Sequence, residues 1–160
     1  MKSYIDKILE SSLVILLGIM VINVVWQVIA RTFNISSSWT EELARYLLIW
    51  LGMLSAAYAT GKKLHLAIDL LPQSLEGASA KRLQAVITIL MALFALGVMV
   101  IGGSRLVILV WELGQTSAAM KLPMGWVYGI IPISGVLIVY YCMHHLITPD
   151  PLFSPNAQTK

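Results

Sequence analysis

The chain has 160 residues, of which 58% are hydrophobic and 12% are charged, and its net charge is +3. A soluble domain carries about 25% charged residues, so the composition argues against a soluble bundle, whose outer faces would have to be polar. The basic residues lie at the ends of hydrophobic segments, where they set membrane orientation, and so they do not indicate nucleic-acid binding. The single cysteine, Cys142, argues against a membrane thiol oxidoreductase, which needs cysteine pairs.

Four hydrophobic segments are each about long enough to cross a bilayer as a helix, which takes roughly 20 apolar residues. Together with the signals at their ends, they predict membrane spans over about residues 8–30, 39–61, 80–111 and 124–147. We therefore predict an all-α integral membrane protein with one four-helix domain over residues 1–147. Residues 148–160 are a proline-rich tail, which we expect to be non-helical.

The orientation follows from the basic residues of the loops and tails. Four spans place both termini on one side of the membrane. If that side is the cytoplasm, seven Lys and Arg residues lie inside and four outside, the four being Arg31, Arg45, Arg105 and Lys121. Cytoplasmic loops carry an excess of Lys and Arg, so we predict cytoplasmic termini and a cytoplasmic tail. The first span lacks a clear signal-peptide cleavage site and is expected to stay as an anchor.

In the first span, Asn23 and Gln27 lie four residues apart and so share a helix face. The structural interpretation is a hydrogen bond between helices, which is worth perhaps 0.6 kcal/mol in a membrane. The functional alternative is a polar site for a transported molecule.

The start of the second span contains a possible capping box, in which Ser38 caps the helix and Glu41 reaches back to it. Glu41 and Glu42 then lie in the first turn, where the helix dipole favours anions. Arg45 follows four and three residues later, which is the spacing of an ion pair along one helix face. We therefore expect Arg45 to be neutralised by one of the two glutamates.

Residues 64–71, between the second and third spans, are too short to cross a membrane. As a helix this segment places His65 and Asp69 on one face, although its pattern also fits a strand. An exposed strand edge is disfavoured beside lipid, so we predict a short interfacial amphipathic helix that ends at Pro72.

The third and fourth spans offer packing signals. The third is expected to run unbroken from near Ala80 to about Leu113. Gly125 and Gly129 form a GxxxG pair, and Pro132 is expected to bend the fourth helix or to mark a packing site. Gly52 and Ala56 form a similar small-residue pair in the second span, which also suggests a close helix contact.

The sequence offers no site for catalysis or for a metal or other cofactor. It has no nucleotide-binding loop and no nucleophile with a base, and the adjacent pair His144 and His145 points to different helix faces. Arg45 is the ionisable residue that lies clearly inside a span, and no Asp or Glu lies near mid-membrane, where an ion-coupled carrier usually needs one. The chain is therefore predicted to be a scaffold or partner, neither an enzyme nor a complete carrier.

Several runs of residues resemble one family over essentially the whole chain to about residue 147. Residues 39–52 are WTEELARYLLIWLG, residues 62–71 are KKLHLAIDLL, and residues 122–128 are LPMGWVY, with Asn23, Arg31 and Pro132 at further matching positions. These segments are similar to the small membrane subunit of tripartite ATP-independent periplasmic (TRAP) transporters. The two longer blocks are fairly specific when they occur together at this separation.

The resemblance implies a subunit of the bacterial inner membrane that joins a large multi-spanning permease subunit and works with a soluble periplasmic substrate-binding protein. In this family the large subunit carries the substrate and sodium sites and moves by an elevator motion, and the small subunit extends the scaffold. The substrates are mostly organic acids. The overall likeness leans toward the sialic-acid type, with a C4-dicarboxylate as the alternative, and no residue here indicates the substrate.

Two other classes stay open as alternatives. A small autonomous exporter would need an essential buried Glu, and the spans contain none. A membrane anchor of a redox enzyme would need histidines at matched depth for a haem, whereas His65, His144 and His145 all lie toward the inner side.

Overall fold

The computed structural model describes residues 2–62 and 78–147, with side chains described for all of these except 78–81. The first hairpin consists of α1 (Lys2–Thr32) and α2 (Ser38–Lys62). The third helix is continuous through α4 (Ala78–Phe94), the π-helix η1 (Ala95–Gly102) and α5 (Gly103–Glu112). The fourth consists of α6 (Met124–Tyr128) and α7 (Ile130–Ile147). We call these last two composite elements helix three and helix four.

The described residues confirm the predicted fold class. Four helices are long and apolar enough to cross a membrane, namely Lys2–Thr32, Ser38–Lys62, Arg82–Glu112 and Met124–Ile147. The predicted interfacial helix over residues 64–71, with His65 and Asp69, lies outside the described residues, as does the tail over residues 148–160.

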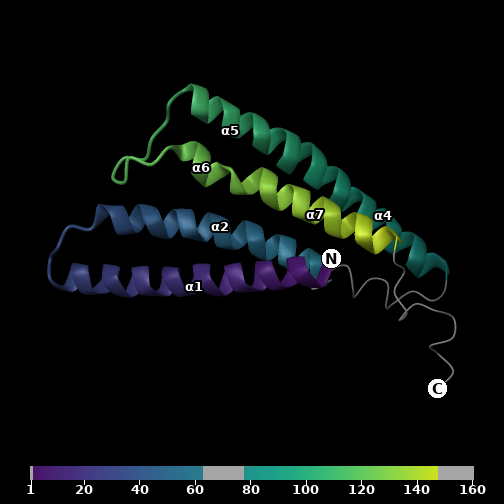
Figure 1. Ribbon diagram of the computed structural model, residues 1–160, viewed down its shortest axis with the longest axis horizontal. Helices are drawn as coiled ribbons and strands as arrows, with labels where there is room; N and C mark the ends of the chain where they lie inside the picture. The colour runs from purple at the N-terminus through teal and green to yellow at the C-terminus, as the bar shows by residue number, and fades with distance from the viewer. Residues whose placement is uncertain (1, 63–77, 148–160) are drawn as a thin grey trace, which may run out of the picture.

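The four helices form two antiparallel hairpins (Figure 1). The connections 33–37 and 113–123 lie together at one end, which we call the loop end. The start of α1 and the ends of α2 and α7 lie at the other, which we call the terminal end. In Figure 1 the hairpins lie close together at the terminal end and diverge toward the loop end.

The helices pack in a row. Within the described residues, α1 packs mainly on α2, α2 packs on α7, and α7 packs on α4 and η1. Only 6% of the apolar window of helix three is buried inside the chain, against 33% in helix four. The first and third helices are therefore the edges of a layer, and their exposed apolar side chains need lipid or another membrane protein to cover them.

Helix four comes very close to its neighbours, because glycines leave room for it. A Cβ on Gly103 would lie 2.9 Å from Ile131 Cγ2 and 3.2 Å from Pro132 Cδ, so Pro132 lies in the contact between helix three and helix four. Pro132 also has no N–H for the carbonyl of Tyr128, and α6 ends at that residue. Helix four is accordingly interrupted at Gly129, between α6 and α7.

The small residues differ in whether they make a close contact with a neighbouring helix. A Cβ on Gly125 would overlap the ring of Trp111, whereas one on Gly129 would meet only backbone of its own helix. The space around Gly52 is open within the described chain, so no neighbouring helix makes a close contact at this glycine. An isolated GxxxG-like spacing does not say which neighbour a helix face will meet.

Helix three differs from the expected uninterrupted α-helix. Residues Ala95–Gly102 are π-helical, and this segment faces α7, where a Cβ on Gly135 would lie 2.8 Å from Met99 Cβ. Sequence patterns at α-helical spacing do not reveal such a widened turn, because it depends on the contact with the neighbouring helix.

Candidate functional site

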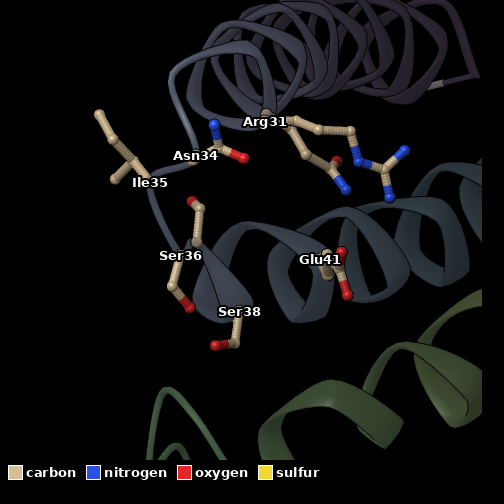
Figure 2. A pocket seen from close by; sticks show the side chains of 8 residues that line it. Arg31, Asn34, Ile35, Ser36, Ser38 and Glu41 are labelled. Atoms are coloured by element: carbon tan, nitrogen blue, oxygen red, sulfur yellow. The ribbon is translucent and has the colours of Figure 1, made fainter.

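A polar pocket lies at the loop end, between the last turns of α1 and the first turn of α2 (Figure 2). Its volume is about 350 Å³, and its walls are formed by Gln27, Arg31, Asn34, Ile35, Ser36, Ser37, Ser38 and Glu41. Asn34 adopts a left-handed conformation (φ 54°) that lets the chain turn between the helices. Figure 2 shows Arg31 from α1 and Glu41 from α2 on different walls of the pocket.

The cap of α2 differs from the predicted one. The Thr40 amide donates to the carbonyl of Ser37 at 3.2 Å. The hydroxyl oxygens of Ser37 and Thr40 lie 2.8 Å apart. The helix therefore starts one residue earlier than the Ser38 and Glu41 box requires. Consecutive serines at positions 36–38 make the register ambiguous in the sequence, and Thr40 occupies the position three residues after Ser37. Glu41 instead lines the pocket.

Glu42 is bound by the opposite hairpin, so the predicted pairing with Arg45 is wrong for this residue. Its carboxylate accepts hydrogen bonds from the Ser117 hydroxyl, from the Ala119 amide at 3.0 Å and from the Met120 amide at 3.1 Å. These donors converge on one carboxylate, because the connection 113–123 turns back toward α2. Glu42 thus joins the two hairpins at the loop end.

Arg45 is exposed, and within the described residues it forms no ion pair with Glu41 or Glu42. The spacing of Glu42 and Arg45 along α2 does not predict this arrangement. The flexible Arg45 side chain competes for the Glu42 carboxylate with several donors that the connection 113–123 holds in place. An intramembrane Arg that has no ion-pair partner among the described residues points outward, to a lipid or to another protein.

Asn23 fulfils the structural role expected from the sequence. Its side-chain amide donates to the carbonyl of Thr40 at 2.9 Å, and both residues are buried between α1 and α2. Gln27 and Arg31, one and two turns later, line the polar pocket. Beside the same hairpin, an apolar groove of about 520 Å³ is lined by Ile19, Ile22, Asn23, Trp26, Trp39 and Leu43.

Farther along α2 from the loop end, two of its side chains contact helix four. The Trp50 indole donates to the carbonyl of Val127 at 3.2 Å, and the Tyr46 hydroxyl lies 3.4 Å from Met124 Sδ. A half-buried indole N–H is stabilised by an acceptor, which accounts for a tryptophan near the middle of α2.

The terminal end contains a second carboxylate that sequence reasoning missed. Asp6 is 9% exposed; its carboxylate accepts a hydrogen bond of 2.6 Å from the Tyr141 hydroxyl and lies 3.5 Å from Lys62 Nζ. Asp6 thereby joins α1 to both α2 and α7. A signal was available, because Asp6 shares the buried face of α1 with Leu9 and the partly buried Leu13, at spacings of three and seven residues.

No group of three His, Cys, Asp or Glu residues that could hold a metal occurs in the described residues. His145 Nε2 lies 3.1 Å from the carbonyl of Thr60, so this ring contributes to the packing of α7 on α2. Taken together, the described side chains bind helices to one another and leave a polar pocket and several exposed charged side chains, Glu41 and Arg45 among them, near the loop end.

Comparison with known proteins agrees with this architecture. The model of the DctQ component of tripartite ATP-independent periplasmic transporters matches residues 20–150. A TRAP transporter small permease protein of Haemophilus influenzae is 30% identical over 146 residues, which cover 91% of this chain and 89% of that protein. A C4-dicarboxylate TRAP transporter small permease protein, DctQ, of Rhodobacter capsulatus is 27% identical over 107 residues, or 67% of this chain and 47% of that protein. The chain therefore belongs to the DctQ family of small membrane components of these transporters.

Proposed function

We propose that this chain is a scaffold subunit that holds a larger permease subunit in the bacterial inner membrane during uptake of an organic acid. The observation that carries this proposal is the single layer of helices. Its edges, α1 and helix three, expose long apolar surfaces, and a layer of this kind has no enclosed path of its own for a polar molecule. An apolar layer of this kind is suited to packing beside a moving partner.

The distribution of charge supports a scaffold over a carrier. Between Glu42 and Gly61, and again over residues 83–111 and 124–147, the sequence contains no Asp or Glu. Ion-coupled carriers usually bind the ion with a carboxylate or an unwound helix near mid-membrane. We therefore assign sodium coupling and the elevator motion to the larger subunit.

We propose that the loop end faces the periplasm, as the positive-inside pattern predicts. The polar pocket, with Arg31 and Glu41, and the connection held by Glu42 would then face the periplasmic substrate-binding protein. Arg45 would contact the partner subunit or a lipid near the same surface. His65 and Asp69 remain proposed interface residues on the cytoplasmic side.

For the transported substrate we propose sialic acid, with a C4-dicarboxylate as the second candidate. The Rhodobacter capsulatus relative carries a C4-dicarboxylate in its name. Uptake of both labelled acids by cells that express the complete system, with and without this chain, would separate the two candidates.

Affinity purification of the tagged chain from native membranes tests the scaffold role. We expect a larger multi-spanning membrane protein to co-purify, and we expect liposomes that contain this chain alone to show no uptake. Recovery of the chain by itself, with uptake retained in liposomes, would overturn the proposal and favour an autonomous carrier.

Cysteine labelling tests the orientation. Ser36 and Ser3 are exposed at the loop end and the terminal end, respectively. In a Cys142→Ser background, a membrane-impermeant thiol reagent added to intact cells should label Ser36→Cys and leave Ser3→Cys unlabelled. The reverse result would invert the proposed topology.

A further inference from the structure

Arg105 is a second intramembrane arginine, which the sequence analysis placed with the loop residues. The structure places it in α5, seven residues before the end of that helix at Glu112, so its Cα lies about 10 Å inside the span. It is six residues from Trp111, and tryptophan is enriched at headgroup level in membrane proteins. Its Cα is therefore about 9 Å deeper than that tryptophan.

The side of helix three on which Arg105 lies follows from its neighbour Gly103. Gly103 is buried against Ile131 and Pro132 of helix four. Two residues along an α-helix rotate the side-chain direction by about 200°, so Arg105 points away from helix four. Its side chain is exposed, and within the described residues no carboxylate lies at ion-pair distance from it.

The surroundings of Arg105 on this side are apolar. Ile101 and Leu109, one turn on either side, are 53% and 52% exposed. The other edge of the layer differs, because α1 carries no charged residue between Glu10 and Arg31. Helix three is thus the edge that combines an apolar surface with a cation, Arg105, that has no ion pair within the described residues. A cation at this depth in the membrane is stabilised by an anionic group on the molecule that covers it.

We propose that the exposed side of helix three, centred on Arg105, docks against a helix of the larger permease subunit that presents an Asp or Glu at the same depth. This inference rests on the proposed scaffold function and names the surface that performs it. Charge complementarity favours a carboxylate at this depth, since it would meet the guanidinium where Arg105 lies and would leave Ile101 and Leu109 covered by apolar side chains. A lipid phosphate would require the Arg105 side chain to bend toward the headgroups.

The first test measures how much larger subunit co-purifies with the tagged chain from membranes. Arg105→Gln should lower the recovered partner at least about tenfold, because a carboxylate would be left unpaired in a low-dielectric contact. Arg105→Lys should retain part of it. Lys7→Gln, which removes an exposed cation at the start of α1, is the control and should leave recovery unchanged. If as much of the larger subunit co-purifies with Arg105→Gln as with the wild-type chain, the proposal is overturned and a lipid phosphate is favoured.

The second test does not depend on a variant that could misfold. A photoreactive side chain at Ile101 should cross-link to the larger subunit in native membranes, and one at Ile15 on α1 should do so much less. Cross-links from position 101 only to lipid would overturn the inference. An absence of any co-purifying partner with the wild-type chain would instead contradict the scaffold function itself, so the two failures are distinguishable.

Discussion

Among the described residues, two carboxylates join the hairpins, one at each end of the layer, and they do so in different ways. Glu42 at the loop end lies at the surface and is bound by a hydroxyl and backbone amides of one connection. Asp6 at the terminal end is buried and is bound by the side chains of Tyr141 and Lys62 from two different helices. Glu42 therefore orders the connection 113–123, whereas Asp6 fixes the positions of whole helices relative to one another.

The difference has a physical cause. A buried carboxylate must keep its partners, because an unpaired charge away from water is costly. A carboxylate at the surface can exchange protein donors for water with little loss. We therefore expect changes at the terminal end to alter the stability of the subunit, and changes at the loop end to alter the order of the surface that faces outward.

The largest effect is expected from Asp6→Ala. The change removes the acceptor of the buried Tyr141 hydroxyl and the partner of the exposed Lys62 side chain, and leaving a buried donor unsatisfied costs about 2 kcal/mol. The midpoint of thermal unfolding of the purified subunit in detergent should fall clearly. Glu10→Gln, exposed on the same helix, is the control and should leave the midpoint unchanged. Equal midpoints for the two variants would show that Asp6 does not hold the helices together.

A smaller effect is expected from Tyr141→Phe. The ring still packs against Gly61, and only the hydroxyl that donates to Asp6 is lost, which removes a charge-assisted hydrogen bond of about 1.5 kcal/mol. The same unfolding measurement should show that Asp6→Ala and Tyr141→Phe are not additive, since both remove the same contact. Additive effects would mean that the two residues stabilise the fold independently.

At the loop end, Glu42→Ala should leave global unfolding almost unchanged and should loosen the connection 113–123. The amides of Ala119 and Met120 lose their shared acceptor, so their hydrogen exchange should become several-fold faster. Glu41→Ala, whose carboxylate lines the pocket, is the matched control. Exchange at these amides that stays at the wild-type rate would contradict the role of Glu42.

The smallest effect on the subunit is expected from Arg45→Ala. Its side chain is exposed and has no ion pair within the described residues, so the unfolding free energy should change by less than about 0.5 kcal/mol. In the complete system the change should lower uptake without altering which ion drives it. A changed ion dependence would place Arg45 in the coupling machinery and would contradict a scaffold role.

Much of the fold could be predicted, because a membrane makes strong demands on a sequence. Four long apolar segments must become helices, since hydrocarbon offers no other partner for backbone N–H and C=O groups. Asn23 was predicted to bond across helices, because it lies in an apolar span at a position where a polar side chain needs a partner. Pro132 was predicted to mark a packing position, because proline restricts the backbone wherever it occurs.

The partners of the charged side chains could not be predicted in the same way. The spacing of Glu42 and Arg45 allowed an ion pair, but the connection 113–123 folds back and supplies better donors. Asp6 and Tyr141 are 135 positions apart, and no local pattern connects them. The sequence by itself thus determined the four membrane-spanning segments and their hydrophobic character, which depend on local hydropathy. Only the tertiary structure decided their order in a row and the pairing of their charges, because those depend on which distant faces meet.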